Sequence, residues 1–256
     1  MRVTFLGTGT SQGVPMIGCQ CAVCTSTDPR DKRLRVSVLM EVKGLRILID
    51  PGPDLRQQLL RAGVSDLDAV LITHEHMDHL AGMDDLRAIS FQYEPPKPVP
   101  IYADAPTQQA VRRVFNYAFR EEKYPGVPQF DLHLIDRQPF NIGGLKVIPI
   151  EVMHMSMPVL GFRVGGFTYI TDAKTIALKE KEKVRGSEVF VVNALRQKEH
   201  YSHLNVAEAL ALVDELKPGR TFFTHISHWM GKHADVELPA NVALAYDGLV
   251  VELQDP

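Results

Sequence analysis

Thr73-His74-Glu75-His76-Met77-Asp78-His79 forms a polar run directly after four apolar residues, which predict a buried strand. His74 and His76 are two residues apart, so both imidazoles point to one side if this segment leaves the strand in an extended form. Asp78 and His79 then open a helix, and their side chains leave the backbone in other directions. Such a run can place two imidazoles on one metal ion, with a carboxylate and a third imidazole on an adjacent one.

Two other interpretations of this run are weaker. The zinc-protease helix motif requires a second histidine four residues after the first, but position 78 is aspartate. Glu75 is therefore not the general base of such an enzyme, and we expect it to point away from the metals. The other interpretation is a polar loop whose histidines hydrogen-bond one another. A run with only one histidine would favour such a loop. Three histidines and an aspartate directly after a buried strand favour a metal site.

Three later residues sit at the ends of predicted strands and can complete a binuclear site. His154 follows one apolar strand, Asp172 follows a second, and His225 follows a third. Each residue alone is typical of an ordinary loop, but together they complete two coordination sets. A carboxylate can bridge two cations through its two oxygens, and Asp172 is the best placed bridging residue.

The remaining chain alternates between strand and helix patterns, without a linker that would divide residues 1–256 into separate domains. This mixture predicts a single domain of the α/β (α+β) class, with two sheets packed face to face and helices outside. The predicted strands are 3–6, 36–42, 46–49, 69–72, 99–102, 145–150, 161–164, 168–170, 189–192, 221–224 and 249–253. The predicted helices are 54–61, 79–89, 106–119, 174–183 and 206–215.

Glycine-containing dipeptides predict hairpin turns at Lys43-Gly44, Gly165-Gly166 and Asp247-Gly248. The last of these is expected to join a strand at 242–246 to the strand at 249–253. One segment, Phe91–Gly126, combines prolines, aromatic residues and several basic side chains. It is interpreted as a surface helix with a packed aromatic side, and a lid over the active site is the alternative.

Composition limits the classes of function. Lys plus Arg is 28 and Asp plus Glu is 31, so the net charge is 28 − 31 = −3, which argues against a long nucleic-acid footprint. No apolar run has the length of a membrane span, and the N-terminus lacks the apolar core of a secretory signal, which predicts a cytoplasmic protein. Three cysteines cannot all pair within one chain, and clustered thiols in a reducing compartment favour metal binding.

The ordered set of these features resembles the metallo-β-lactamase superfamily. The resemblance includes Leu6-Gly7-Thr8-Gly9-Thr10 after the first strand, the Ile49-Asp50-Pro51-Gly52 segment, the His74–His79 run and the three later residues. Local matches are similar to the phosphoribosyl 1,2-cyclic phosphate phosphodiesterase (PhnP-like) branch. These are Gly7–Pro15, the cysteine-rich segment 18–24 and Thr224-His225-Ile226-Ser227-His228.

The resemblance implies a four-layer αββα sandwich with two metal ions at one edge of its sheets. It implies that Asp50 supports the site from behind, by accepting a hydrogen bond from a ligating imidazole. A turn-initiating aspartate before Pro51 is the competing interpretation. The implied ligands are His74, His76 and His154 for the first metal, Asp78, His79 and His225 for the second, and Asp172 as the bridge.

Cys19, Cys21 and Cys24 form a C-x-C-x-x-C cluster in a turn of small residues. Three thiolates leave a tetrahedral zinc ion one ligand short, and histidine is the available completion. The resemblance implies that His228 is this fourth ligand, so that a structural zinc ties the N-terminal loop to the loop carrying His225. Three reduced thiols without metal and an iron–sulfur cluster are the alternatives.

Two divalent metal ions, zinc or manganese, would activate a hydroxide and neutralise phosphoryl charge, which suits hydrolysis of a small, cyclic phosphodiester. The resemblance places His203 at the catalytic histidine of the branch, near the leaving group, and Asp78 within the catalytic metal site. A glycine-rich loop at Gly7–Gly13 can also cradle a phosphate, although turn geometry alone explains its glycines. His133, His200 and His233 are interpreted as surface or structural residues.

The alternatives within the same superfamily are a tRNA 3′-processing nuclease and a lactone or thioester hydrolase. A non-catalytic zinc-stabilised binding protein is a further alternative, and it would require an empty second site. The expected partner is a small-molecule phosphodiester, with no membrane and no nucleic acid. Members of the branch are often homodimers, but no residue pattern in this chain specifies one.

Overall fold

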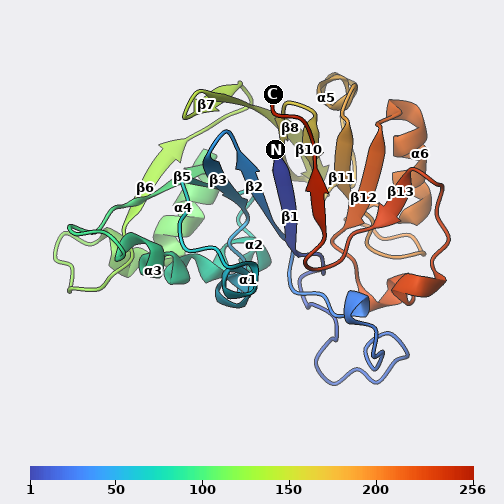
Figure 1. The fold of residues 1–256 in the computed structure, drawn as a ribbon, viewed down its shortest axis with the longest axis horizontal. Helices are drawn as coiled ribbons and strands as arrows, with labels where there is room; N and C mark the ends of the chain where they lie inside the picture. Colours follow the sequence, from blue (N-terminus) through green and yellow to red (C-terminus); the bar gives the residue numbers. More distant parts are fainter.

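Two seven-stranded sheets face each other in the computed structural model, which describes residues 1–256 (Figure 1). The first sheet has the order β14-β1-β2-β3-β4-β5-β6 and the second has the order β13-β12-β11-β10-β9-β8-β7. The strands of the first sheet are β1 (Arg2–Gly7), β2 (Ser37–Val42), β3 (Leu45–Ile49), β4 (Ala69–Leu71), β5 (Val99–Ala103), β6 (Phe130–Leu134) and β14 (Val250–Glu252). Those of the second are β7 (Phe140–Ile142), β8 (Leu145–His154), β9 (Met157–Val164), β10 (Phe167–Tyr169), β11 (Val189–Asn193), β12 (Arg220–Thr224) and β13 (Val242–Leu244).

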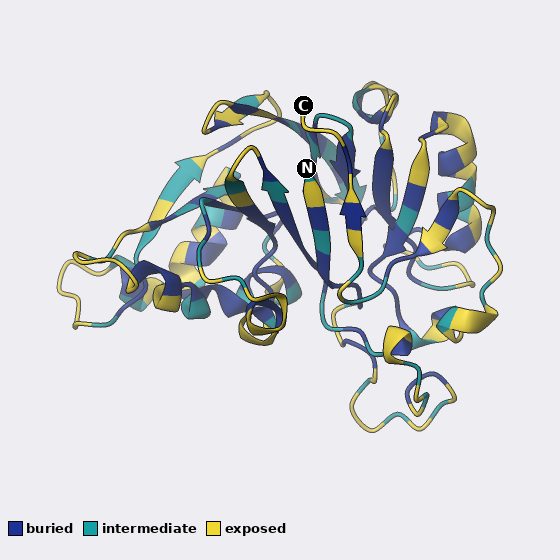
Figure 2. Cartoon of the chain, viewed as in Figure 1, coloured by how far each residue is buried: buried dark blue, intermediate teal, exposed yellow.

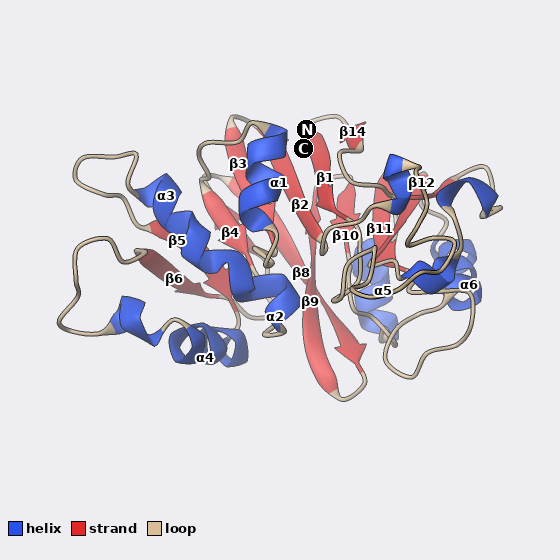
Figure 3. Cartoon of the chain, turned by 90° about the horizontal axis from the view of Figure 1, so that it is seen from below, coloured by secondary structure: helices blue, strands red, loops and turns tan.

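Helices cover the outer face of each sheet, which confirms the expected αββα layers (Figure 3). The α-helices are α1 (Leu55–Ala62), α2 (Met77–Leu80), α3 (Arg87–Ser90), α4 (Ala105–Val114), α5 (Leu178–Val184) and α6 (Val206–Leu216). Helices α1 to α4 lie over the first sheet, and α5 and α6 lie over the second. None of these helices combines the length and the apolarity needed to cross a bilayer.

Three apolar clusters hold the layers together. The central cluster contains buried side chains from both sheets, including Phe5 and Val38 from the first and Phe162 and Phe167 from the second. The other two clusters lie between each sheet and its helices. Every residue of β4, β10 and β11 is buried, because these strands are covered on both faces. In Figure 2, teal and yellow appear on the edge strand β6 and on the outer side of the helices.

The predicted hairpin at Asp247-Gly248 is wrong. The turn is present, but β13 pairs with β12 in the second sheet and β14 pairs with β1 in the first. The chain therefore crosses between the sheets at this turn. The other two predicted hairpins are confirmed, because Lys43-Gly44 joins β2 to β3 and Gly165-Gly166 joins β9 to β10.

The predicted helix at 79–89 is interrupted. It consists of α2, a 3-10 helix at Ala81–Leu86 and α3. A Cβ atom on Gly82 would lie 2.0 Å from the carbonyl oxygen of Gly52, so this segment approaches the loop after β3 more closely than a side chain allows. The Gly82 N–H donates to the Pro51 carbonyl at 2.9 Å. This close approach places the segment that carries Asp78 against the loop that begins at Asp50.

The helix predicted at 174–183 begins later, at Leu178, because Lys174 and Thr175 instead hydrogen-bond to Met153 at the end of β8. In the Phe91–Gly126 segment, Val111, Phe115 and Ala118 are buried against the first sheet. No residue of this segment lines the pocket described below, in agreement with the surface-helix interpretation rather than the lid.

Candidate metal centre

The seven predicted ligand residues converge at one edge of the two sheets, although they come from both. The first sheet contributes the segment after β4 together with α2, and the second contributes residues at the ends of β8, β10 and β12. In Figure 3, α2 lies beside the β8–β9 hairpin, and the Thr73 carbonyl accepts a hydrogen bond from Leu160 at 3.0 Å. The edge where the strand ends meet is therefore where the polar side chains gather.

The second predicted ligand set is compact. His79 Nε2 lies 3.2 Å from Asp78 Oδ2, and His225 Nε2 lies 3.6 Å from the same carboxylate oxygen. Asp172 faces both imidazoles, with Oδ2 at 3.3 Å from His79 Nε2 and Oδ1 at 3.3 Å from His225 Nε2. The ligand atoms of Asp78, His79 and His225 all lie within 4.8 Å of one another, as one cation requires.

The first predicted set is wider and also meets Asp172. The His74 and His76 ring centroids are 4.6 Å apart, and that of His154 is 5.3 Å from His76 and 6.2 Å from His74. The ligand atoms of His76, His154 and Asp172 lie within 4.8 Å of one another, as do those of His74, His79 and Asp172. The carboxylate of Asp172 thus lies close to ligand atoms of both predicted sets.

Hydrogen bonds behind the imidazoles fix which nitrogen faces the site. Asp50 is fully buried, and its Oδ2 accepts from His79 Nδ1 at 2.7 Å and from the Thr73 hydroxyl at 2.9 Å. Because that hydroxyl donates to Asp50, its contact with His74 Nδ1 at 2.9 Å has the imidazole as donor. His154 Nδ1 donates to the Ser202 carbonyl at 2.9 Å. In all three imidazoles, Nε2 is left to face the site.

The donor set fits divalent cations. The Nε2 atoms of His74, His79 and His225 are buried without a protein hydrogen-bond partner, which is costly unless another group satisfies them. Burial alone would raise the pKa of the Asp172 carboxyl, but the neighbouring His225 and His79 hold it well below its usual range. Burial also opposes the charge on Asp78, but His79 and His225 lower the pKa of this carboxyl. Two charged carboxylates among unpartnered imidazoles form a typical set of ligands for a pair of cations.

Backbone strain is concentrated at this site. Asp50, Asp172 and His225 have φ values of 60°, 55° and 55°, and Met155, which follows His154, has 56°. Only two other non-glycine residues in the chain have a positive φ. Left-handed backbone conformations are disfavoured for residues with a Cβ atom, and they cluster where function requires a particular side-chain direction.

We expect that replacing Asp50 by Asn will lower the affinity of the site for metal about 10- to 100-fold, because the amide cannot replace the charged acceptor behind His79. Asparagine tolerates the positive φ at this position, so the backbone is preserved. Competition with a chelator measures the affinity. The control is Asp104→Asn at the N-cap of α4, where asparagine caps equally well. Unchanged metal affinity in Asp50→Asn would contradict a supporting role.

The cysteine cluster forms a second group of ligand atoms. The sulfur atoms of Cys19 and Cys21 both lie 3.3 Å from His228 Nδ1, and all four ligand atoms, including that of Cys24, lie within 4.8 Å of one another. The backbone N–H of Cys24 lowers the pKa of the Cys21 thiol to about 6, while burial raises that of Cys24 to about 11. The predicted fourth ligand is therefore at the cluster.

The two chain segments that carry the cysteine cluster are far apart in sequence, but backbone hydrogen bonds join them. The loop between β1 and β2 pairs with the segment after β12, since the Thr10 N–H donates to Ile226 O at 3.1 Å and the Ile226 N–H donates to Thr8 O at 2.9 Å. In Figure 1 this loop, coloured blue, lies at the bottom beside the orange C-terminal segment. The short segment after β12 thus carries both His225 of the candidate metal centre and His228 of the cysteine cluster.

A pocket of about 370 Å³ is lined by five of the seven residues, namely His76, Asp78, His154, Asp172 and His225. His203 lines it and is mostly buried, with Nδ1 at 3.8 Å from Asp172 Oδ1 and its ring 4.6 Å from that of His154. Burial, together with the nearby His225, lowers the pKa of His203 to about 3, so the imidazole is neutral at pH 7 in the free protein. The other lining residues include Thr10 to Gly13, His200, Tyr201, Ser227, His228 and Trp229.

His200, which the sequence analysis interpreted as a surface or structural residue, lines this pocket. Its ring stacks on that of Tyr201 at 4.4 Å and lies tilted against that of His203 at 5.3 Å. Tyr201 and Trp229 were not predicted as site residues. Their position next to His200 and His228 in the sequence is the only signal for them. His133 and His233 do lie away from the pocket, against Tyr102 and Arg33 respectively.

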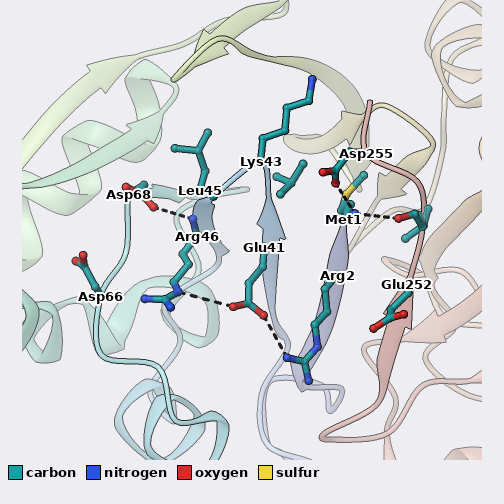
Figure 4. A pocket seen from close by; sticks show the side chains of 13 residues that line it. Met1, Arg2, Glu41, Lys43, Leu45, Arg46, Asp66, Asp68, Glu252 and Asp255 are labelled. Carbon is teal, nitrogen blue, oxygen red and sulfur yellow. Dashed lines mark hydrogen bonds and ion pairs between the residues drawn. The ribbon is translucent and has the colours of Figure 1, made fainter.

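A larger hollow, of about 570 Å³, lies around the chain termini and the turn between β2 and β3 (Figure 4). Some of its charged side chains pair with one another. Glu41 contacts Arg2 at 3.6 Å and Arg46 at 3.7 Å, and the backbone N–H of Arg46 donates to Asp68 at 2.7 Å. It contains no histidine or cysteine, so it offers none of the chemistry of the candidate metal centre.

Residues 45–226 match the family model of the beta-lactamase superfamily domain. A curated relative, an octanoyltransferase of Porphyromonas gingivalis, is 41% identical over 254 residues, which cover 97% of this chain and 51% of the relative. The chain therefore spans about half the length of the octanoyltransferase.

Two solved structures extend the comparison. The crystal structure of a diphosphatase from the PhnP family has a TM-score of 0.92 and 39% identity, and the match covers 99% of this chain and 98% of that one. The zinc-bound structure of PqqB from Methylobacterium extorquens has a TM-score of 0.77 and 21% identity, with coverage of 99% and 100%. The second similarity concerns the fold alone.

Proposed function

Because the chain belongs to the metallo-β-lactamase superfamily of metal-dependent hydrolases, we propose that it is a binuclear phosphodiesterase acting on a small phosphodiester. The position of Asp172 carries the proposal. Its carboxylate faces ligand atoms from both predicted sets, which is the arrangement that a bridging ligand requires. Similarity to a diphosphatase supports a phosphoryl substrate rather than a lactone or a thioester.

The proposed metals are two divalent cations, zinc or manganese. Two such ions, when bound, lower the pKa of a water molecule and neutralise charge on a phosphoryl group. The chain supplies the geometry: Asp50 and the Ser202 carbonyl orient His79 and His154, and Asp172 links the two halves. The proposed ligands are His74, His76 and His154 for one ion, Asp78, His79 and His225 for the other, and Asp172 for both.

We propose that His203 acts on the leaving group. Its Nδ1 is buried without a hydrogen-bond partner, and it lies on the pocket side of Asp172. As a neutral imidazole it can donate one hydrogen bond to the leaving oxygen. A bound phosphoryl anion would raise its pKa and favour transfer of a proton.

Replacing His203 by Gln is expected to lower kcat about 100-fold for a 2′,3′-cyclic nucleotide, whose alkoxide leaving group needs a proton. The loss should be much smaller for bis(p-nitrophenyl) phosphate, because nitrophenolate leaves without protonation. Steady-state kinetics with both substrates measure this difference, with His133→Gln as the control. Equal losses for the two substrates, together with the loss of one metal ion, would instead make His203 a ligand.

The cysteine cluster is proposed to hold a structural zinc through Cys19, Cys21, Cys24 and His228. The supporting observation is the four-atom group itself, in which the low pKa of Cys21 favours its thiolate.

We also propose that residues 1–256 act as a single cytoplasmic domain.

Turnover of bis(p-nitrophenyl) phosphate and of cyclic phosphates, with zinc or manganese added, tests the proposed activity. No turnover of any phosphodiester by metal-loaded protein would overturn it. Cleavage of precursor tRNA in the absence of small-ester turnover would favour the processing nuclease, although the net charge of −3 argues against that substrate.

A further inference from the structure

A turn of the N-terminal loop forms part of the pocket wall but has no role in the chemistry proposed above. Thr10 to Gly13 line the pocket together with five of the proposed metal ligands. The Gly13 N–H donates to the Thr10 carbonyl at 2.8 Å, which closes the turn. Gly13 has a φ of 65°, whereas neither Ser11 nor Gln12 has a positive φ, so residues 10–13 form a type I turn.

This turn is held next to a proposed metal ligand. Gly9 pairs with Ile226 in an isolated β-bridge, and the Thr10 N–H donates to the Ile226 carbonyl at 3.1 Å. Ile226 directly follows His225 in the chain. Because the turn begins at Thr10, these hydrogen bonds fix its position on the His225 side of the candidate metal centre.

Two successive backbone N–H groups of the turn have no acceptor within the protein. The N–H groups of Thr10 and Gly13 make the hydrogen bonds given above, but those of Ser11 and Gln12 donate to no protein atom. Successive N–H groups in a turn form a concavity that binds anions. Since Ser11 and Gln12 both line the pocket, an anionic oxygen bound in the pocket is an acceptor that suits them.

A guanidinium packs against the same turn. A Cβ atom on Gly13 would lie 3.4 Å from Arg35 Nη1 and 3.7 Å from Arg35 Cδ, so the Arg35 side chain is in contact with the turn. Arg35 Nε lies 3.1 Å from the Asp54 carboxylate, which holds the side chain in place, while Nη1 and Nη2 have no protein acceptor. A positive charge beside two free N–H groups makes this part of the wall favourable for a negatively charged ligand.

We infer that the turn at residues 10–13 binds a non-bridging oxygen of the phosphoryl group that reacts at the metals. This inference rests on the proposed function, since it gives the same phosphoryl group a further contact. The Ser11 and Gln12 N–H groups donate to the oxygen, and Arg35 stabilises its charge from behind the turn. The turn is then a positioning element, because it fixes the orientation of the phosphoryl group.

Replacing Ser11 by Pro removes one of the two N–H groups, and proline is favoured at this position of a type I turn. Calorimetry of the zinc-loaded variant with inorganic phosphate should give a Kd about tenfold higher than that of the wild type, because a hydrogen bond to a charged group is lost. Ser11→Ala keeps the N–H and loses only the hydroxyl, so it should bind phosphate about tenfold more tightly than Ser11→Pro. The zinc content per chain should be the same in all three proteins.

Replacing Arg35 by Gln tests the charge behind the turn and leaves every N–H in place. The Kd for phosphate should rise about threefold at low salt, and the rise should shrink at high salt because ions screen the charge. Arg46→Gln is the matched control, since Arg46 also faces a carboxylate through Nε, that of Glu41 at 3.7 Å, but in the hollow at the chain termini. This control should keep the wild-type Kd.

A wild-type Kd in folded Ser11→Pro, or an equal rise in Ser11→Pro and Ser11→Ala, would overturn the inference. If Ser11→Pro does not fold, a wild-type Kd in Arg35→Gln at low salt would overturn it. These measurements do not depend on turnover. Failure of the metal-loaded protein to hydrolyse any phosphodiester would therefore reject the proposed function, while the phosphate Kd values alone decide whether the turn binds the anion.

Discussion

Replacing Asp172 by Asn should lower kcat/KM for bis(p-nitrophenyl) phosphate about a thousandfold, which corresponds to about 4 kcal/mol of transition-state stabilisation. The amide removes the negative charge that faces His79 and His225 at 3.3 Å each, and it cannot bridge two cations as a carboxylate does. Asparagine is the right replacement because it accepts the left-handed backbone of this position, whereas alanine would add strain.

Metal analysis should show that Asp172→Asn loses at least one active-site ion, while its circular dichroism spectrum stays that of the folded wild type. Asp131→Asn is the matched control, because Asp131 also contacts a histidine, His133 at 2.9 Å, but on an exposed edge strand. If Asp172→Asn retained most of its activity with both ions bound, Asp172 would not be the bridge.

Replacing Cys21 by Ser should remove one zinc ion per chain and lower the melting temperature by about 10 °C. The zinc ion, if bound at a thousand times its Kd, contributes about 4 kcal/mol, and each kcal/mol shifts the melting temperature of a chain of this size by about 2–4 °C. We also expect kcat/KM to fall about tenfold, because the cluster ties down His228 and the adjoining Trp229 at the pocket wall.

Thr25→Ala controls for changes in the same loop, since it removes only an exposed hydrogen bond to the Cys21 carbonyl. This variant should keep its zinc and its activity. Full retention of stability and metal content in Cys21→Ser would contradict the structural zinc and would support three reduced thiols. Loss of metal with full activity would show that the cluster does not position the pocket wall.

That the seven residues of the candidate metal centre converge could be predicted, because most of them lie at or just after the end of an apolar strand. His74, Asp172 and His225 all follow short apolar strands, and the ends of neighbouring strands meet at one edge of a sheet. The sandwich follows from the same strands, because few of their positions are polar. The superfamily resemblance, inferred from the order of these motifs, is confirmed by the family match and by the diphosphatase structure.

Other features depend on contacts that the local sequence pattern does not reveal. The edge strands β6 and β7 were missed because they are short and partly exposed, so their apolar pattern is weak. The Asp247-Gly248 turn has the composition of a hairpin, but pairing of β14 with β1 overrides it. The Arg196 side chain meets Trp229 only after the loops following β11 and β12 are brought together. Nothing in either loop alone indicates this contact.

The central claim is that two metal ions at one site act together on a phosphodiester. Its most direct test is the rate of bis(p-nitrophenyl) phosphate hydrolysis as metal-free protein is titrated with zinc or manganese. We predict that activity rises steeply only as the second active-site ion binds, after the cysteine cluster has been filled. Full activity with a single active-site ion, or no activity with both ions bound, would contradict the two-metal account.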